Sequence, residues 1–177
     1  EPGNSATGEK SIAVLPFVNM SADKENEYFS DGISEELLNV LVRVEGIGVA
    51  SRTSSFAYKG RELGAAAIAK ELKVDHILEG SVRKAGNRVR ITAQLIDASN
   101  DRHLWSETYD RELTDIFAVQ EEIAKAIAGE LGDALGIDAA AKGVRVEQPT
   151  EDLAAYEDFL RGRQLFHQRG EGLLTAR

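Results

Sequence analysis

Cysteine is absent from the 177 residues of this sequence, and methionine and tryptophan occur once each. The absence of cysteine excludes disulfide bonds, thiolate metal sites and cysteine nucleophiles, but it leaves the cellular compartment open. No apolar run approaches the roughly 20 residues that a membrane-spanning helix needs. The opening segment, EPGNSATGEK, lacks the charged and apolar regions of a secretory signal. Because Met20 is the only methionine, we expect the chain to be a fragment or a mature form, with any membrane anchor outside it.

Basic residues are outnumbered by acidic ones, 21 against 30, and the formal net charge is −9. This balance repels a polyphosphate backbone, so nucleic-acid binding is not expected. Arg83, Lys84, Arg88 and Arg90 form a local basic cluster. A charged tip that keeps an exposed hairpin soluble explains the cluster better than a nucleic-acid site does.

The segment from Leu78 to Asp97 predicts a β-hairpin. Apolar and polar residues alternate with period two on both sides of Gly86-Asn87, which suits a two-residue turn. In that register Val82 faces Ile91, and one face of the hairpin is apolar. The other face carries Glu79, Ser81, Arg83, Arg90, Thr92 and Gln94. A sheet of this kind packs its apolar face on helices.

Two buried strands are predicted before the hairpin. The continuous apolar run from Ile12 to Phe17 is typical of a strand buried on both faces, and Pro16 marks its end. Residues Ile47 to Ser51 form the second strand. Helical crossovers make these strands parallel, whereas the hairpin and a further strand over Arg102 to Asp110 are antiparallel. The sheet is therefore predicted to be mixed.

Helices are expected to connect and cover these strands. Ser30 or Asp31 is expected to cap the first helix, which places Glu35 and Glu36 in its first turn, where carboxylates suit the helix dipole. An alanine-rich helix is expected around Leu63 to Leu72. After the sheet, Thr114 or Asp115 is expected to cap the longest helix. Its apolar stripe consists of Ile116, Val119, Ile123, Ile127, Leu131 and Leu135.

The predicted fold is an α/β fold with a small mixed sheet of about five strands packed by helices, in the order strand-helix-strand-helix-strand-strand-strand-helix. A C-terminal helical hairpin segment follows, which begins at Pro149-Thr150. We divide the chain into a linker (1–10), the α/β domain (11–135), a second linker (136–149) and a truncated helical segment (150–177).

Six motifs occur in a fixed order along the chain: SIAVLPF (11–17), YFSDGISEEL (28–37), SRTSSF (51–56), LEGSVRKAGNRVRITAQLID (78–97), LWSETYDREL (104–113) and DIFAVQEEIA (115–124). Together they resemble the TolB-like amino-terminal domain family over essentially Ser11 to Leu135. The resemblance implies a small α/β domain with a mixed sheet, like the amino-terminal domain of the periplasmic protein TolB. The segment AAYEDFLRGRQLF (154–166) resembles the lead-in to tetratricopeptide repeats.

Domains of this family commonly sit beside an adenylate or guanylate cyclase domain, or beside a winged-helix DNA-binding domain and a membrane span. The resemblance therefore implies a signalling protein with several domains. It transfers no cyclase activity to the residues of this chain. The analogy with TolB favours a periplasmic location, with a cytoplasmic location as the alternative.

The Ser51 to Ser55 turn is the best candidate for a small-ligand site. The side chains of Arg52, Thr53, Ser54 and Ser55, with the backbone amides of the turn, could hold an anion. Helix capping by the same hydroxyls is the competing interpretation.

A second group of candidate residues is assigned to protein interaction: Glu79, Arg83, Arg90, Tyr156, Phe159 and Phe166. For Glu79 an ion-pair network that fixes strand register competes with binding, and for Trp105 a place in the core competes with an interaction surface.

Catalytic, metal and cofactor sites are not expected. His76, His103 and His167 lack companion ligands at zinc spacing, the serines lack a paired base, and adjacent Glu35 and Glu36 are interpreted as helix-dipole partners. We hypothesise a non-enzymatic interaction or sensing module of a larger bacterial signalling protein, which binds a protein or a small ligand. The alternative is part of an adenylate or guanylate cyclase whose catalytic domain lies outside this chain. The expected partner is a protein or a second copy, joined through a sheet edge or the C-terminal helices.

Overall fold

The computed structural model describes residues 10–133 and 152–175, with the backbone alone for 132–133 and 169–175. The elements within these ranges follow the order β1 (Lys10–Val14), β2 (Val18–Asn19), η1 (Lys24–Asn26), α1 (Glu27–Val42), β3 (Ile47–Val49), α2 (Arg52–Phe56), α3 (Ala65–Leu72), β4 (His76–Ala85), β5 (Arg88–Asp97), β6 (Arg102–Glu112), η2 (Leu113–Asp115), α4 (Ile116–Asp133) and α5 (Leu153–Thr175). None of the described helices is long and apolar enough to cross a membrane.

The strands form one mixed sheet, as predicted, and their spatial order in it is β3-β1-β4-β5-β6. β1 pairs in parallel with β3 and β4, whereas β4, β5 and β6 are antiparallel. A sixth strand that the sequence did not predict, β2, adds a short parallel pairing to β4 just beyond Pro16. The predicted hairpin register is confirmed, since Val82 lies opposite Ile91 and the turn is made with Gly86 at a φ of 56°.

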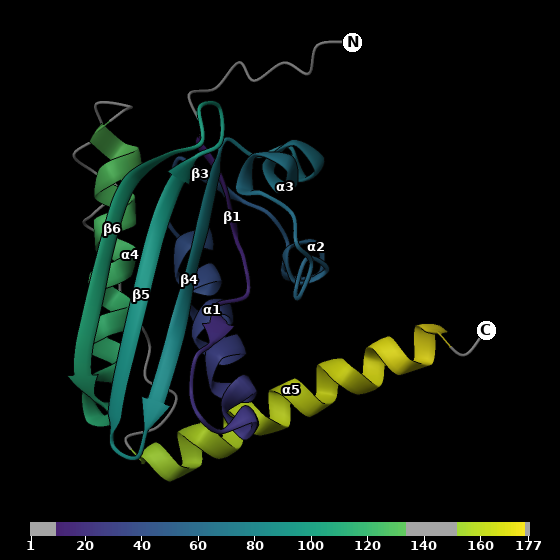
Figure 1. Ribbon diagram of the computed structural model, residues 1–177, viewed down its shortest axis with the longest axis vertical. Helices are drawn as coiled ribbons and strands as arrows, with labels where there is room; N and C mark the ends of the chain where they lie inside the picture. Colours follow the sequence, from purple (N-terminus) through teal and green to yellow (C-terminus); the bar gives the residue numbers. More distant parts are fainter. Residues whose placement is uncertain (1–9, 134–151, 176–177) are drawn as a thin grey trace.

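Helices cover the two faces of the sheet unequally. The larger core joins alternate residues of β1, β4 and β5 to α1, α4 and the first half of α5, and α1 and α4 lie behind the sheet in Figure 1. A smaller core on the other face contains Ala13, Leu15, Ile68, Ala69, Ile77 and Ile96 and is closed by α3. Because α2 and α3 lie beside β1 and β4, much of the polar face of β4, β5 and β6 stays open.

The start of α1 differs from the prediction. The helix begins at Glu27 after the turn η1, so Ser30 and Asp31 are buried inside it and do not cap it. Glu35 and Glu36 consequently lie in the middle of α1, and their interpretation as partners of the helix dipole is wrong. These polar residues resemble a cap in the sequence, but their partners come from other elements, as described below.

The C-terminal segment is one continuous helix, α5, and therefore not the predicted hairpin. With 23 residues α5 is longer than α4, which has 18, so the prediction that the helix after the meander is the longest is wrong. The carboxylate of Asp152 accepts hydrogen bonds from the backbone N–H groups of Ala154 (2.9 Å) and Ala155 (3.4 Å) at the start of α5. Lys10 belongs to β1 and not to the predicted linker. Residues 1–9, Leu135, the predicted linker 136–149 and the predicted helix start at Pro149 lie outside the described residues.

Candidate functional site

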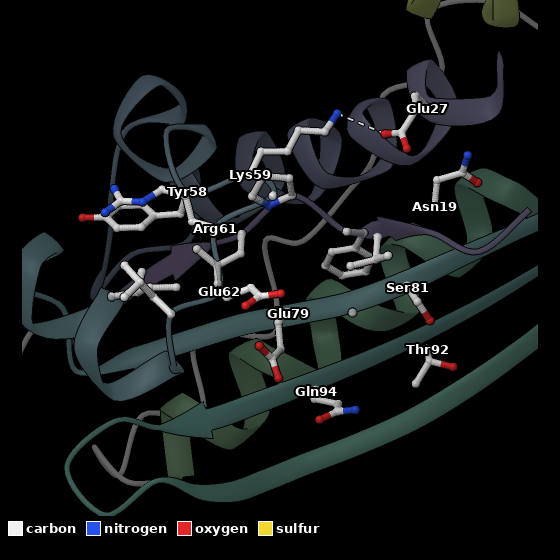
Figure 2. A pocket seen from close by; sticks show the side chains of 18 residues that line it. Asn19, Glu27, Tyr58, Lys59, Arg61, Glu62, Glu79, Ser81, Thr92 and Gln94 are labelled. Atoms are coloured by element: carbon white, nitrogen blue, oxygen red, sulfur yellow. Dashed lines mark ion pairs between the residues drawn. The ribbon is translucent and has the colours of Figure 1, made fainter. Parts of the chain in front are cut away.

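A cleft of about 640 Å³ opens on the polar face of the sheet (Figure 2). It lies between β4 and β5 on one side and, on the other, the β1–β2 connection and the loop from Tyr58 to Leu63 that joins α2 to α3. We call it the sheet cleft. Its apolar lining consists of Leu15, Pro16, Phe17, Val18, Leu63 and Ile68.

The strands contribute polar side chains to the sheet cleft. Glu79 lies opposite Gln94, and Ser81 lies opposite Thr92, in the register that the hairpin pattern predicted. Gly80 lies between the two pairs. A Cβ atom at Gly80 would lie 2.1 Å from the carbonyl oxygen of Thr92 and 2.8 Å from the ring of Phe17. The wall of the cleft is therefore packed too closely at this point for any side chain.

The loop contributes charged side chains to the same cleft. Lys59 Nζ contacts Asp31 Oδ2 at 2.7 Å and Glu27 Oε2 at 3.1 Å, so two carboxylates neutralise its charge. The guanidinium of Arg61 stacks on the ring of Tyr58, 5.1 Å from its centre.

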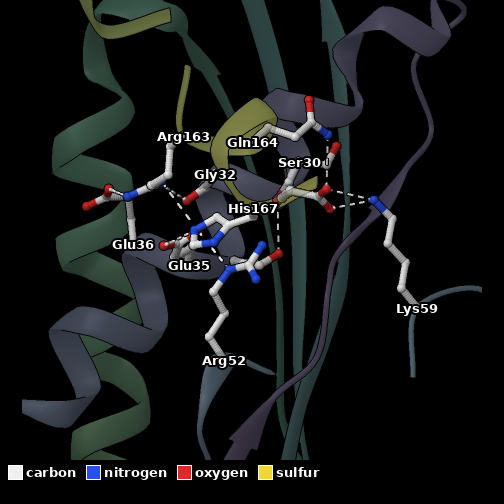
Figure 3. A network of polar contacts seen from close by, with 11 residues as sticks. Ser30, Gly32, Glu35, Glu36, Arg52, Lys59, Arg163, Gln164 and His167 are labelled. Carbon is white, nitrogen blue, oxygen red and sulfur yellow. Dashed lines mark hydrogen bonds and ion pairs between the residues drawn. The ribbon is translucent and has the colours of Figure 1, made fainter. Parts of the chain in front are cut away.

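A polar network on α1 adjoins the cleft and reaches α5 (Figure 3). Asp31 accepts hydrogen bonds from Lys59 and, at 3.3 Å, from Gln164 Nε2 of α5. Glu35 Oε2 contacts Arg52 Nε at 3.1 Å and Arg163 Nε of α5 at 3.4 Å.

Further contacts of α5 complete this network. Arg163 also contacts Glu36 Oε1 at 2.8 Å. His167 Nε2 lies 3.5 Å from Glu35 Oε1. Asp31 therefore holds Lys59 from the α2 side and Gln164 from α5. Glu35 likewise contacts Arg52 from the α2 side, together with Arg163 and His167 from α5.

Burial and the contacts with oppositely charged groups together set the pKa values of Asp31 and Lys59. Burial raises the pKa of the Asp31 carboxyl, although the ammonium of Lys59 opposes that shift. Burial lowers the pKa of Lys59, but its contacts with Asp31 and Glu27 outweigh this effect, so the net shift is upward. Lys59 therefore remains a cation at neutral pH.

The predicted anion site at Arg52, Thr53, Ser54 and Ser55 is the short helix α2. Ser51 Oγ accepts a hydrogen bond from the backbone N–H of Ser54 at 3.2 Å, which is the capping arrangement that competed with anion binding. Arg52 is already paired with Glu35, and Ser55 is buried. The anion site stays an untested prediction, and its only cation, Arg52, is the residue already paired with Glu35.

The predicted interaction residues are not brought together in one place. Tyr156 differs most from the prediction, because it is fully buried in this chain, with its ring 4.7 Å from that of Phe117 and its hydroxyl accepting a 3.2 Å hydrogen bond from Gln120. Phe159 and Phe166 of α5 are exposed, at 46% and 75%.

The charged members of that set lie on the hairpin. Glu79 lines the sheet cleft, and among the described residues it does not form the ion pair expected for it. Arg90 contacts Asp110 at 2.8 Å on the open sheet face. Arg83 lines a second hollow, beside the hairpin turn and the start of α1, together with Lys84 and Arg161. Trp105 is partly buried and packs against the larger core, in line with the competing interpretation.

The contribution of the loop to the cleft is not predicted by the sequence. Lys59, Arg61 and Glu62 lie between two helices, where no periodic pattern indicates which way a side chain points. The link from Arg163 and Gln164 to α1 was also missed, because these residues are more than a hundred positions from their partners. Within the described residues, no group of three or more His, Asp or Glu side chains could hold a metal ion.

These features define an α/β domain with a cleft on its sheet and a long helix, α5, docked on α1. The fold is similar to that of part of TolB: the solved structure of TolB from Acinetobacter baumannii superposes with a TM-score of 0.52 at 16% identity, over 72% of this chain and 29% of that chain. The C-terminal domain of LpoB from Salmonella enterica gives a TM-score of 0.47 at 18% identity, over 62% of this chain and 87% of that chain.

Residues 8–126 match the family described as HilA/YgeH-like transcriptional regulator, second domain, and the chain belongs to this family. It is also similar to putative adenylate cyclase 3 of Rhizobium meliloti (strain 1021), with 45% identity over 168 residues. That match covers 95% of this chain and 28% of the relative, so the chain spans less than a third of that protein's length.

Proposed function

We propose that this chain is a non-enzymatic binding and sensing module of a longer bacterial signalling protein. Its family is described as a domain of transcriptional regulators, whereas its relative in Rhizobium meliloti is named an adenylate cyclase. Transcriptional regulation and adenylate cyclase activity are chemically unrelated. A domain that occurs with both is best explained by a role that both can use, such as binding a ligand or a partner.

The observation that carries this proposal is the sharing of Asp31 and Glu35 between the cleft side and α5. Lys59 lines the sheet cleft and holds Asp31, to which Gln164 of α5 also binds. A ligand that displaces Lys59 changes the charge that Asp31 presents to α5. Binding at the cleft is in this way relayed to the helix that leads out of the domain.

Several finer features belong to the same proposal. The α/β domain ends near residue 135, a linker follows, and α5 opens a tetratricopeptide-like region. A protein partner or a second copy contacts the exposed apolar side chains Phe159 and Phe166 of α5. A TolB-like fold supports a periplasmic location, with any membrane anchor outside this chain.

A double-mutant cycle on Arg52 and Arg163 tests the relay. Both guanidinium groups contact the same oxygen of Glu35, so removal of one changes the environment of the other. We expect Arg52→Met and Arg163→Met to be non-additive in the free energy of unfolding by about 0.5 kcal/mol or more, with either sign. Urea denaturation of the two single variants and the double variant measures this coupling.

Arg90→Met combined with Arg163→Met is the matched control. Arg90 pairs with Asp110 on the sheet, and within the described part of the chain it shares no ion-pair partner with Arg163. Its cycle should be additive to within about 0.5 kcal/mol. If the Arg52 cycle is as additive as the control, α5 does not respond to the α2 side and the sensing proposal fails.

The alternative function is part of an adenylate or guanylate cyclase whose catalytic domain lies outside this chain. The name of the Rhizobium meliloti relative favours it. This alternative is compatible with a sensing role, but it excludes turnover by the domain itself. Incubation of the purified chain with ATP or GTP and Mg²⁺ should yield no cyclic nucleotide. Turnover that a carboxylate substitution abolishes would overturn the non-enzymatic assignment.

A further inference from the structure

The sheet cleft contains two carboxylates that nothing in the described part of the chain neutralises. Glu79 is half-buried on β4, and Glu62 is exposed on the loop; neither forms an ion pair or a hydrogen bond with a described side chain. Figure 2 shows both side chains at the cleft, with Gln94 beside Glu79. A partly buried carboxylate without a partner favours a cation brought by a ligand.

The cations of the cleft are already engaged. Lys59 is held by Asp31 and Glu27, and Arg61 is exposed and stacked on Tyr58. An anionic ligand would have to compete with two carboxylates for Lys59 and would meet Glu79 unscreened. The net charge of −9 on the whole chain adds to this preference for cations.

Apolar surface flanks the unpaired carboxylates. Val18 is 59% exposed and Leu63 is 37% exposed, and both line the cleft together with the buried Phe17. Ser81 and Gln94 add hydrogen-bonding groups beside Glu79. The volume of about 640 Å³ lies in the range of about 300–1,000 Å³ that small-molecule sites occupy.

We infer that the sheet cleft binds a small organic cation with an apolar body. Its ammonium or guanidinium group contacts Glu79 and Glu62, while its apolar body covers Val18 and Leu63. This inference rests on the proposed binding function and adds the chemical class of the ligand.

Phenethylamine is a suitable probe, and 2-phenylethanol is its uncharged counterpart of nearly the same shape. Phenethylamine should shift the backbone amide resonances of Leu63 and Ser81 in the isotope-labelled chain, and the shifts should saturate. A hydrogen bond to a charged group corresponds to about a 10-fold or larger change in affinity, so 2-phenylethanol should bind at least about 10-fold more weakly.

Substitutions locate the charge contact. Glu79→Gln should weaken phenethylamine binding about 10-fold, and Glu62→Gln should weaken it to a smaller extent. Because Glu62 is exposed on the loop, we expect its substitution to leave the fold unchanged. Glu112→Gln is the matched control, because Glu112 is an exposed glutamate at the end of β6 outside the cleft. Far-ultraviolet circular dichroism establishes that each variant is folded.

Three results would overturn the inference: equal binding of the alcohol and the amine, unchanged affinity in both cleft variants, or no saturable shift with phenethylamine. These failures are distinct from failure of the proposed relay. If phenethylamine does not bind but the Arg52–Arg163 cycle is non-additive, the proposed relay stands and only the proposed class of ligand is wrong. If phenethylamine binds but the resonances of Arg163 and Gln164 do not shift and the cycle is additive, the cation site stands and the proposed relay is wrong.

Discussion

Replacement of Gly80 by alanine should strongly destabilise the sheet. A methyl group at this position would lie 2.1 Å from the carbonyl oxygen of Thr92 and 2.8 Å from the ring of Phe17. A relaxed carbon–oxygen contact is about 3.3 Å or longer, so one of the groups must move by more than about 1 Å. Thr92 cannot yield easily, because β5 is paired with β4 on one side and β6 on the other.

The magnitude follows from the rigidity of these neighbours. Overpacking a well-packed site costs about 1–3 kcal/mol, and we expect Gly80→Ala at or above the upper end because the closest atom is backbone. For a chain of this size 1 kcal/mol lowers the melting temperature by about 2–4 °C, which gives a decrease of about 6–12 °C. Urea denaturation and a thermal melt followed by circular dichroism measure both quantities.

Gly129→Ala provides the matched control for this substitution. Gly129 lies within α4, and nothing lies within 4 Å of a Cβ atom placed there. Alanine is the better helix former, so this variant should gain about 0.5–1 kcal/mol. If Gly80→Ala unfolds within about 0.5 kcal/mol of the unmodified chain, the close approach of β4 and β5 at this position is not rigid and the reasoning is refuted.

Three other changes probe how α5 is held and how the chain responds to alkali. Tyr156→Phe should cost about 1–2 kcal/mol in urea denaturation, because the buried amide of Gln120 loses its partner. Burial raises the pKa of Tyr156 to about 12, so the unfolded chain ionises first and stability should fall as the pH rises from about 10 to about 12; in Tyr156→Phe this fall should be smaller. A Cβ atom at Gly32 would lie 2.7 Å from Leu160 Cδ2, so Gly32→Ala should destabilise the contact of α1 with α5, and the added Leu160→Ala should cost less than it does alone. A pH-independent Tyr156 contribution, or strict additivity of Gly32→Ala with Leu160→Ala, would contradict these expectations.

The mixed sheet could be predicted because its signals are local. The period-two alternation around Gly86-Asn87 determines which residues face each other, and the register from Leu78 opposite Leu95 to Val82 opposite Ile91 follows from the turn. The same alternation predicts that Glu79, Ser81, Thr92 and Gln94, which line the sheet cleft, share the polar face of the hairpin. Short pairings such as β2, which has two residues, leave no periodic trace in a sequence.

The start of α1 could not be predicted in the same way. Ser30 and Asp31 have the composition of a helix cap, but the carboxylate of Asp31 is satisfied by Lys59, 28 positions away, and by Gln164, 133 positions away. Tyr156 was assigned to a surface because its aromatic partner, Phe117, belongs to another helix. Residue type alone does not distinguish a side chain that binds a partner protein from one that binds its own domain.

The contacts of α5 are divided along its length, which determines how the relay operates. Tyr156, Leu160, Arg163, Gln164 and His167 share one face of the helix by their spacing. The first two side chains are buried in the larger core, whereas the last three make polar contacts to α1. A change in the charge around Asp31 and Glu35 weakens the contacts of Arg163, Gln164 and His167. It leaves the packing of Tyr156 and Leu160 in place, since that packing does not depend on the charge of these two carboxylates. We therefore expect α5 to remain anchored at its N-terminal end and to change direction beyond Leu160, so that a small displacement at the cleft becomes a larger one at the end of the helix.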